Sequence, residues 1–346
     1  MEQISFIEKL IGEDTPFRNY EIKSMGIKAT PVYDAYWKFA VERQNIFFKR
    51  FNHENAPWTD DNILKTYKFT NAYRASDRVS QYLIKDVIYN GSDYSPEDMF
   101  FRIMLFKIFN KIETWQYLEK NLGNITFKDY KYNLYDNLLT KALEDKNKIY
   151  SAAYIMPSGS KEFGNSKKHE NNLMLLERMM RDNVIKKIAK IKKLKELYEL
   201  LLSYPTIGSF LAFQYAIDLN YSELCDFSEN TFVVAGPGAK RGIEKCFEDK
   251  GKYTYEDIIR FMAEHQEKEF ERLNLNFKSL WGRKLHLIDC QNLFCETDKY
   301  SRVAFPQFDG NIKGKRIKQK FKVNNEVIHY FYPPKWGINE VIVNKK

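Results

Sequence analysis

The sequence predicts a mainly α-helical fold with a small β element at its C-terminal end. Between residues 67 and 202, apolar residues recur at helical spacing, and helix-capping signals divide the stretch. Near the end of the chain, polar and apolar residues alternate around an Asn-Asn pair, which is typical of a β-hairpin. With 346 residues, of which 44% are hydrophobic and 16% aromatic, the chain is able to bury a sizeable core.

The helical elements follow from spacing and capping. The segment Pro31–Phe51 is rich in aromatic residues and is expected to contain a helix. A Ser95-Pro96-Glu97-Asp98 signature is expected to cap the helix that follows it. The loop Ser158–His169, rich in Gly, Ser and Lys, is of the kind that carries function on a rigid scaffold. The other predicted helices are Tyr67–Tyr89, Met99–Asn121, Tyr132–Ile149 and Asn171–Leu202, the last with a break near Asp182-Asn183.

Three regions are expected along the chain. Residues 1–66 form an N-terminal helical and aromatic segment packed on the body, and residues 67–305 form the helical body. Residues 306–346 form a basic C-terminal extension, in which Arg316–Tyr332 is the predicted hairpin, centred on Asn324-Asn325.

Charge and cysteine content limit the class of protein. Lys and Arg number 55 against 46 Asp and Glu, a net charge of +9 that favours a polyanionic partner. Four cysteines are too few for a disulfide framework in a chain of this length. There is no apolar run of the roughly 18 residues that span a bilayer, and acids stand where a signal peptide would be apolar. We therefore expect a cytoplasmic protein with no membrane partner, and the pattern indicates no particular protein partner.

A short Pro-x-x-Gly turn is predicted between two helices at Ser203–Ser209. Its backbone N–H groups and the start of the next helix can receive a DNA phosphate. The turn resembles the Leu-Pro-Gly-x-Gly motif of the helix–hairpin–helix DNA glycosylases, with Pro205, Thr206 and Gly208 at the matching positions. Phe210 stands where bifunctional members carry a lysine nucleophile, so the resemblance implies a monofunctional enzyme that activates water. The alternative is an ordinary corner between two helices.

A carboxylate downstream of the turn would suit glycosidic cleavage, because it can orient water and offset the positive charge of an oxocarbenium-like sugar. Asp226 and Glu229 lie eighteen and twenty-one residues after Gly208, close to the family spacing of about twenty. The run Glu229-Asn230-Thr231-Phe232-Val233 favours Glu229 as the catalytic residue, with Asp226 second. Either carboxylate could instead cap a helix.

The run from Gly236 to Ile243 is a second candidate phosphate contact. Gly236 and Gly238 allow close backbone approach, and Lys240 and Arg241 stand at a predicted helix start. The run is not a Walker A loop, and the string G-x-x-x-x-G-K-[ST] does not occur in the sequence, which counts against a nucleotide kinase of the P-loop type. A plain turn is the alternative.

Polar residues are crowded into Leu287–Val303. Gln291 and Asn292 could read a base edge, and Asp289 is a third candidate for the catalytic carboxylate. Cys290 and Cys295 lack the spacing of a zinc site, so buried thiols are favoured and no metal is predicted.

Four strings together resemble one family, the helical domain of 5-hydroxymethyldeoxyuridine DNA kinases and related thymine-hypermodification proteins. The family also includes phage-defence glycosylases that act on glucosylated hydroxymethylcytosine. The resemblance covers most of residues 30–305 and implies a helix–hairpin–helix glycosylase-like helical fold. The strings are Phe69–Tyr82, Leu105–Asn110, Val233–Phe247 and Asp289–Val303.

The first of these strings supplies candidates for a base pocket. Asn71, Tyr73 and Arg74 could line a site where a flipped base stacks and meets hydrogen-bond donors. An Arg–Asp network that braces the core, using Asp77 and Arg78, is the alternative.

The leading hypothesis is a monofunctional DNA glycosylase, without a cofactor, that excises a hypermodified pyrimidine from double-stranded phage DNA in anti-phage defence. Two alternatives remain open. One is an enzyme that modifies hydroxymethyl pyrimidines in DNA, for instance by phosphorylation, and the other is a non-catalytic reader of modified DNA.

Overall fold

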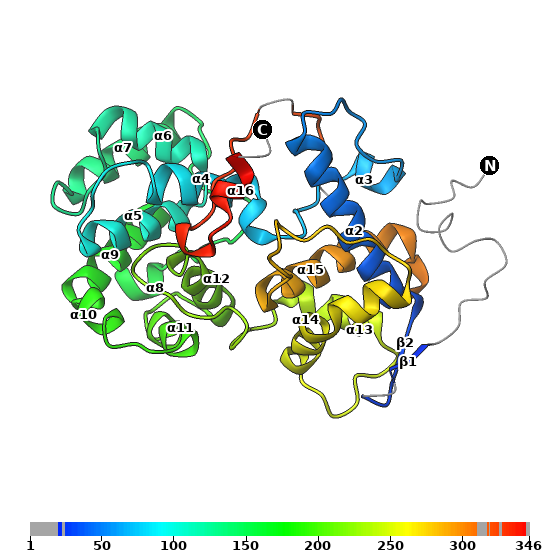
Figure 1. Cartoon of the computed structure of the whole chain (residues 1–346). Coiled ribbons are helices and arrows are strands. Elements are labelled where there is room, and N and C mark those ends of the chain that lie inside the picture. The colour runs from blue at the N-terminus through cyan, green and yellow to red at the C-terminus, as the bar shows by residue number, and fades with distance from the viewer. Residues whose placement is uncertain (1–19, 23–24, 310–316, 318, 325–326, 344–346) are drawn as a thin grey trace. The chain divides into compact units, whose positions relative to one another are not determined.

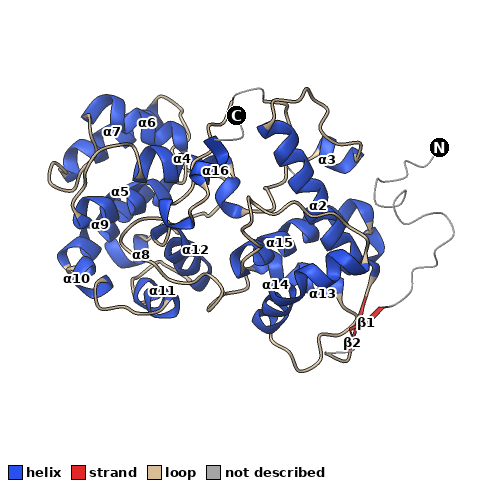
Figure 2. Ribbon diagram, in the orientation of Figure 1, coloured by secondary structure: helices blue, strands red, loops and turns tan. Residues whose placement is uncertain are grey.

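The computed structural model describes residues 20–22, 25–309, 317, 319–324 and 327–343 (Figure 1). The chain divides into two compact units. The first unit comprises residues 1–77 and 233–329, and the second comprises residues 78–232 and 330–346. The prediction of a mainly helical protein is confirmed, since the described residues contain many helices and a single two-stranded sheet (Figure 2).

The first unit begins with a short antiparallel hairpin, β1 (Tyr20–Ile22) and β2 (Ile27–Ala29). Helix α2 (Pro31–Phe51) follows directly, as predicted. Thr30 caps it, because its hydroxyl accepts the Val32 N–H at 3.2 Å. The remaining elements of this unit are α3 (Asn62–Thr66), η1 (Arg74–Ser76), α13 (Pro237–Cys246), α14 (Tyr255–Arg272), α15 (Leu287–Ala304) and η3 (Pro306–Phe308).

Helices α13 and α15 pack unusually closely in the first unit, and two glycines of α13 make this possible. A Cβ at Gly242 would lie 2.1 Å from the carbonyl oxygen of Phe294, and one at Gly238 would lie 3.1 Å from Cys295 Sγ. The first distance is far below van der Waals contact, so only glycine fits there. The Gly-rich run therefore has a packing role in addition to any role at the helix start.

The second unit consists of helices and connecting loops, with no strand among its described residues. Ser95 caps α5 (Pro96–Phe109) as predicted, since its hydroxyl accepts the Asp98 N–H at 3.1 Å. The break expected near Asp182-Asn183 is confirmed, because Asn183 is left-handed with φ of 52°. The other elements are α4 (Arg78–Tyr82), η2 (Leu83–Ile88), α6 (Ile112–Leu122), α7 (Tyr132–Glu144), α8 (Ser160–Phe163), α9 (Lys168–Arg181), α10 (Val184–Ile188), α11 (Leu194–Leu202), α12 (Ser209–Leu219), η4 (Pro334–Trp336) and α16 (Asn339–Val343).

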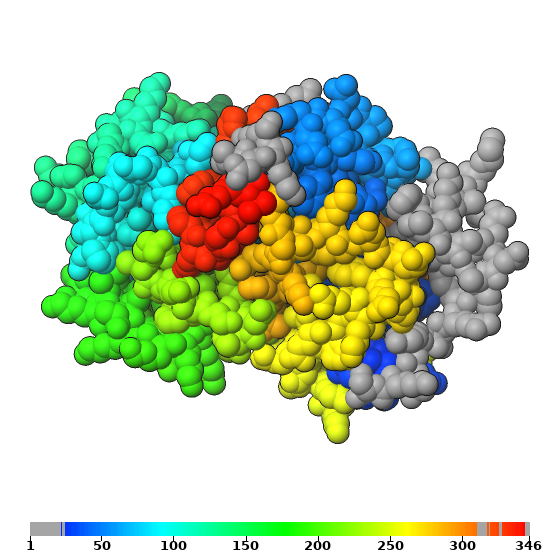
Figure 3. Space-filling model, viewed as in Figure 1, coloured from blue at the N-terminus to red at the C-terminus, as the bar shows by residue number. Residues whose placement is uncertain are grey.

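Residues 330–343 belong to the second unit and form part of its surface (red in Figure 3). The Phe331 N–H donates to Gln81 Oε1 at 2.9 Å, and Lys335 Nζ donates to the carbonyl of Ser222 at 3.1 Å. These contacts tie a segment that is remote in sequence to α4 and to the loop that follows α12.

The predicted C-terminal hairpin is not confirmed, and the predicted start of one helix is wrong. The described residues of Arg316–Tyr332 form no strand, while Asn325 lies outside the described residues. The backbone groups of residues 319–321 pair with residues 66–68 instead, through an isolated bridge between Tyr67 and Lys320. The helix predicted from Tyr67 begins only at Arg78.

Candidate functional site

Helix α15 connects to the Phe69–Tyr82 string within the first unit. The Thr70 N–H donates to Glu296 Oε2 at 3.0 Å, and Asn292 Nδ2 donates to Thr70 Oγ1 at 3.0 Å. The Arg74 N–H donates to Asp289 Oδ1 at 2.9 Å. These bonds occupy backbone donors that an α-helix would use internally, which explains why the segment before Arg78 is not α-helical.

Arg43 of α2, fewer than thirty residues earlier in the chain, also braces this segment. Its Nε donates to the carbonyl of Thr70 at 2.9 Å, and its Nη2 donates to Asn71 Oδ1 at 3.0 Å. The Asn71 N–H donates to Asp77 Oδ1 at 2.8 Å, and Asn71 Nδ2 donates to the carbonyl of Ser76 at 2.8 Å. The contacts of Asn71 therefore support the bracing network that the sequence left open as an alternative.

The Asp77 carboxyl group titrates in an unusual range. Burial raises its pKa to about 7 and Glu296 adds to the rise, whereas the Asn71 N–H and the charge of Arg43 act against it. The folded-state pKa lies above the ordinary value of 3.8. The group therefore contributes fully to the free energy of unfolding at a pH below 3.8. This contribution is lost as the pH rises through the folded-state pKa.

We therefore expect Asp77→Asn to flatten the pH dependence of stability. Relative to wild type, the free energy of unfolding of the variant should rise between about pH 4 and about pH 8. Urea unfolding at a series of pH values measures this difference, with the exposed Asp93→Asn as the control. A difference between variant and wild type that is constant with pH would contradict the expectation.

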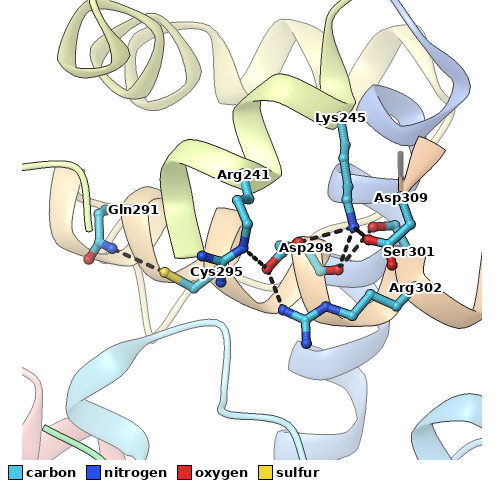
Figure 4. Close-up of polar contacts among 8 residues, drawn as sticks. All are labelled: Arg241, Lys245, Gln291, Cys295, Asp298, Ser301, Arg302 and Asp309. Carbon is cyan, nitrogen blue, oxygen red and sulfur yellow. Dashed lines mark hydrogen bonds and ion pairs between the residues drawn. The ribbon is translucent and has the colours of Figure 1, made fainter. Parts of the chain in front are cut away.

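Asp298 of α15 is the centre of an ion-pair cluster that joins α15 to α13 (Figure 4). Its carboxylate lies 3.0 Å from Arg241 Nε, 2.6 Å from Arg302 Nη2 and 3.0 Å from Lys245 Nζ. Lys245 Nζ also pairs with Asp309 at 2.5 Å. Burial opposes ionisation of Asp298, but Arg302 and Lys245 outweigh it and lower its pKa. These ion pairs hold Val233–Phe247, the third family string, against α15.

The structure places the predicted base-pocket residues inside the first unit. Tyr73 is buried, and its hydroxyl donates to the Arg283 carbonyl at 2.5 Å and accepts the Leu280 N–H at 3.2 Å. Gln291 is buried, and its Nε2 contacts Cys295 Sγ at 3.2 Å. Arg74 and Asn292 are buried as well. These side chains therefore pack around α15 and take part in its hydrogen bonds.

The three candidate carboxylates are divided between the units. Glu229 is buried in the second unit, and Asp226 of the same loop is 87% exposed, 3.9 Å from Lys335 Nζ. Asp289 lies in the first unit, where its Oδ2 accepts the His286 N–H at 3.0 Å and caps α15.

The Pro205–Gly208 turn joins α11 and α12 in the second unit. Thr206 is left-handed with φ of 68°, a conformation that glycine takes readily and a β-branched residue rarely adopts. The turn thus has a glycine-like backbone at the position where the resembled motif has glycine. Gly208 is the N-cap of α12 and offers no side chain to the first N–H groups of that helix.

The Gly236–Arg241 run starts α13 in the first unit. Gly236 is the N-cap, Pro237 is the first helical residue, and no side chain caps the helix start. Lys240 is exposed, with Nζ 5.4 Å from the ring centroid of Tyr255. Arg241, in contrast, is engaged by Asp298, so Lys240 is the more accessible of the two cations.

The cysteines are free thiols, and three of them are buried. Burial raises the pKa of Cys225 and of Cys295 to about 12, so neither is an activated thiolate. Within the described ranges, one group could offer metal ligands, namely Asp136, His169 and Glu170, whose ligand atoms lie within 4.8 Å of one another. The Lys167 ammonium group, 3.4 Å from Glu170, already supplies positive charge there.

Sequence reasoning missed Arg43, which organises the Thr70–Asp77 segment. A lone arginine in an aromatic helix carries no motif, so only its tertiary contacts reveal it. Across the residues that the structure describes, no helix has both the length and the apolar character needed to cross a membrane.

Comparison with known proteins identifies a relative in Bacillus phage SP10 that is named a 5-hmdU DNA kinase. It is 27% identical over 339 residues, which cover 92% of this chain and 53% of the relative. The chain therefore spans about half the length of the curated relative that it matches. No solved structure matches the chain significantly.

The similarity to this kinase, together with a match to a family model, overturns the leading hypothesis from the sequence. A kinase is a transferase that moves a phosphoryl group, whereas a glycosylase is a hydrolase that cleaves a glycosidic bond. The prediction of a monofunctional DNA glycosylase is therefore wrong, and the alternative of hydroxymethyl-pyrimidine modification is better supported. A family model described as "5-hmdU DNA kinase, helical domain" matches residues 30–310, and the chain belongs to this family.

Proposed function

We propose that this protein acts in DNA base modification. It binds DNA that carries a 5-hydroxymethyl pyrimidine, and a phosphoryl group is transferred to the hydroxymethyl group of that base. The observation that carries the proposal is the match over residues 30–310 to the helical domain of 5-hmdU DNA kinases. The relative from phage SP10, itself named a kinase of this type, extends the similarity over 92% of the chain.

The proposed reaction is an ordinary phosphoryl transfer. The hydroxymethyl oxygen attacks the terminal phosphorus of a nucleoside triphosphate, and the bond from that phosphorus to the bridging oxygen breaks. The nucleoside diphosphate leaves, and the proton of the hydroxymethyl group passes to a general base. Such a reaction needs its acceptor held in line with the donor, so DNA binding is the part we assign to this chain.

The second unit supplies the features that suit a DNA backbone. The Pro205–Gly208 turn and the uncapped start of α12 resemble the hairpin of helix–hairpin–helix proteins, and we assign them a phosphate contact. The chain leading to α11 carries six exposed lysines in the same unit, which add a positive surface. The lysines are Lys186, Lys187, Lys190, Lys192, Lys193 and Lys195. In the first unit, Gly236, Gly238 and Lys240 are proposed as a further contact.

Two measurements test the proposal. We expect the protein to bind a duplex with 5-hydroxymethyluracil at least about tenfold more tightly than the matching thymine duplex, measured by fluorescence anisotropy. Transfer of labelled phosphate from ATP to the modified duplex would show that the chain also catalyses the reaction. Equal affinity for both duplexes without label transfer would refute the proposal.

The lysine surface has its own test. The double variant Lys186→Gln/Lys187→Gln should reduce the slope of log affinity against log salt by about 2 if both side chains contact phosphates. The control is Lys128→Gln/Lys131→Gln, which removes two exposed lysines elsewhere in the same unit. A slope change no larger than that of the control double variant would exclude Lys186 and Lys187 from the DNA interface.

A further inference from the structure

The first unit contains a cavity of about 400 Å³ that none of the predicted site residues lines. Its volume lies within the range of sites for small organic ligands. Four aromatic residues contribute to its wall, namely Trp58, Tyr67, Phe69 and Phe321. Flat rings gathered around one space are suited to stacking against a nucleobase, since every base offers a π-face.

The wall is held in place by backbone hydrogen bonds between distant parts of the sequence. The Phe321 N–H donates to the carbonyl of Thr66 at 2.9 Å, and the Lys68 N–H donates to the carbonyl of Gln319 at 3.0 Å. These bonds set Phe321 beside the residues that follow α3. Trp58 is fixed separately, because its Nε1 donates to the Glu54 carbonyl at 2.7 Å.

Three cations line the cavity. They are Arg43, Arg50 and Lys65, and no carboxylate is among the lining residues that the structure describes. The Arg50 guanidinium lies 5.1 Å from the ring centroid of Trp58, so a cation stands beside one of the aromatic rings of the wall. Lys65 Nζ lies 3.9 Å from Asp60, which is exposed, and Arg43 interacts with the charges of Asp77 and Glu296 on its other side. A ligand that joins an aromatic ring to negative charge would match this lining.

We propose that this cavity is a nucleotide-binding site, in which the aromatic wall receives the base and Arg50 and Lys65 attract the phosphate. The inference rests on the proposed function, for which it names the site. Arg43 connects the cavity to the Thr70–Asp77 segment through its bonds to Thr70 and Asn71. A bound nucleotide would therefore contact the residue that organises the first family string.

A nucleotide could reach this site from two sources that share the same chemistry. It is either a nucleotide extruded from DNA or a free nucleoside triphosphate. Binding of ATP is measured by calorimetry, and binding of 5-hydroxymethyluracil and thymine duplexes by anisotropy. The variants are Trp58→Leu and Arg50→Gln, and Arg260→Gln, at a residue of the same unit that does not line the cavity, is the charge control. Circular dichroism and thermal unfolding establish that each variant is folded.

If the nucleotide comes from DNA, both variants should lose the preference for the modified duplex, with a loss of affinity of about tenfold or more. If it is a free nucleotide, both should bind ATP at least about tenfold more weakly while binding DNA normally. Folded variants that retain wild-type binding of both probes would overturn the site, as would a wild-type protein that binds neither ATP nor the modified base preferentially.

The two proposals fail in different ways. A wild-type protein that neither prefers the modified duplex nor transfers label would refute the proposed function. A wild-type preference that survives in Trp58→Leu and in Arg50→Gln would leave the function standing and refute only the cavity as its nucleotide site.

Discussion

Replacing Asp298 with asparagine should lower the free energy of unfolding by about 3–5 kcal/mol. Asp298 is 1% exposed and is shared by three cations, two of which come from α13. Asparagine preserves the shape of the side chain and removes its charge, so buried Lys245 keeps only Asp309 as a counter-ion and Arg302 loses the Asp298 carboxylate. The cost is large because a charge that has left water needs its counter-ion.

The pH dependence of this effect has a defined sign. The folded-state pKa of Asp298 is lowered from 3.8, so its stabilisation is present above that value and is lost as the pH falls through the lower folded-state pKa. Urea unfolding should therefore show a large difference between wild type and variant at about pH 7 and a smaller one at about pH 3. Asp60→Asn removes an exposed carboxylate in the same unit and is the control. Equal stability of the two variants at neutral pH would contradict this account.

A second large loss is expected in the second unit for Lys107→Met. Lys107 of α5 and Asp218 of α12 form an ion pair at 3.2 Å, with their side chains 2% and 0% exposed. Lys107 Nζ also donates to Asn110 Oδ1 at 2.7 Å. The substitution leaves the Asp218 carboxylate buried without its lysine, which should cost about 3–5 kcal/mol.

A double variant separates the charge effect from a packing effect. Lys107→Met/Asp218→Asn removes both charges, and it should recover most of the stability because no buried ion remains. Lys111→Met is the matched control, since its pair with Glu113 is partly exposed and should be worth less than about 1 kcal/mol. A double variant no more stable than Lys107→Met would show that packing, and not the ion pair, dominates at this site.

Local signals in the sequence predicted much of the helical structure correctly. The Ser95-Pro96 signature places the start of α5, because a hydroxyl acceptor followed by proline satisfies a helix start using adjacent residues only. The break at Asn183 follows the same logic, since asparagine tolerates the left-handed conformation. The helix predicted over Met99–Asn121 is instead divided at Asn110, another left-handed asparagine, into α5 and α6.

The candidate site was less accessible to sequence reasoning. The strings that mark the family were found, and the structure brings the first and third of them against α15 through Thr70, Arg74 and Arg241. Their roles could not be read from spacing, because the partner of each group lies far away in the chain. The glycosylase hypothesis failed for a related reason: a hairpin and a downstream carboxylate resemble a motif, but they do not specify which bond is broken.

The sequence by itself determined the mainly helical class, the helix caps and the strings that mark the family, because these depend on residues within a few positions of one another. Only the tertiary structure decided that residues 67–73 are not helical, since the Thr70 N–H is taken by Glu296 from α15. It also formed the aromatic cavity, whose wall joins α2 and α3 to Phe321. Such pairings depend on long-range hydrogen bonds and packing, which local propensity does not encode.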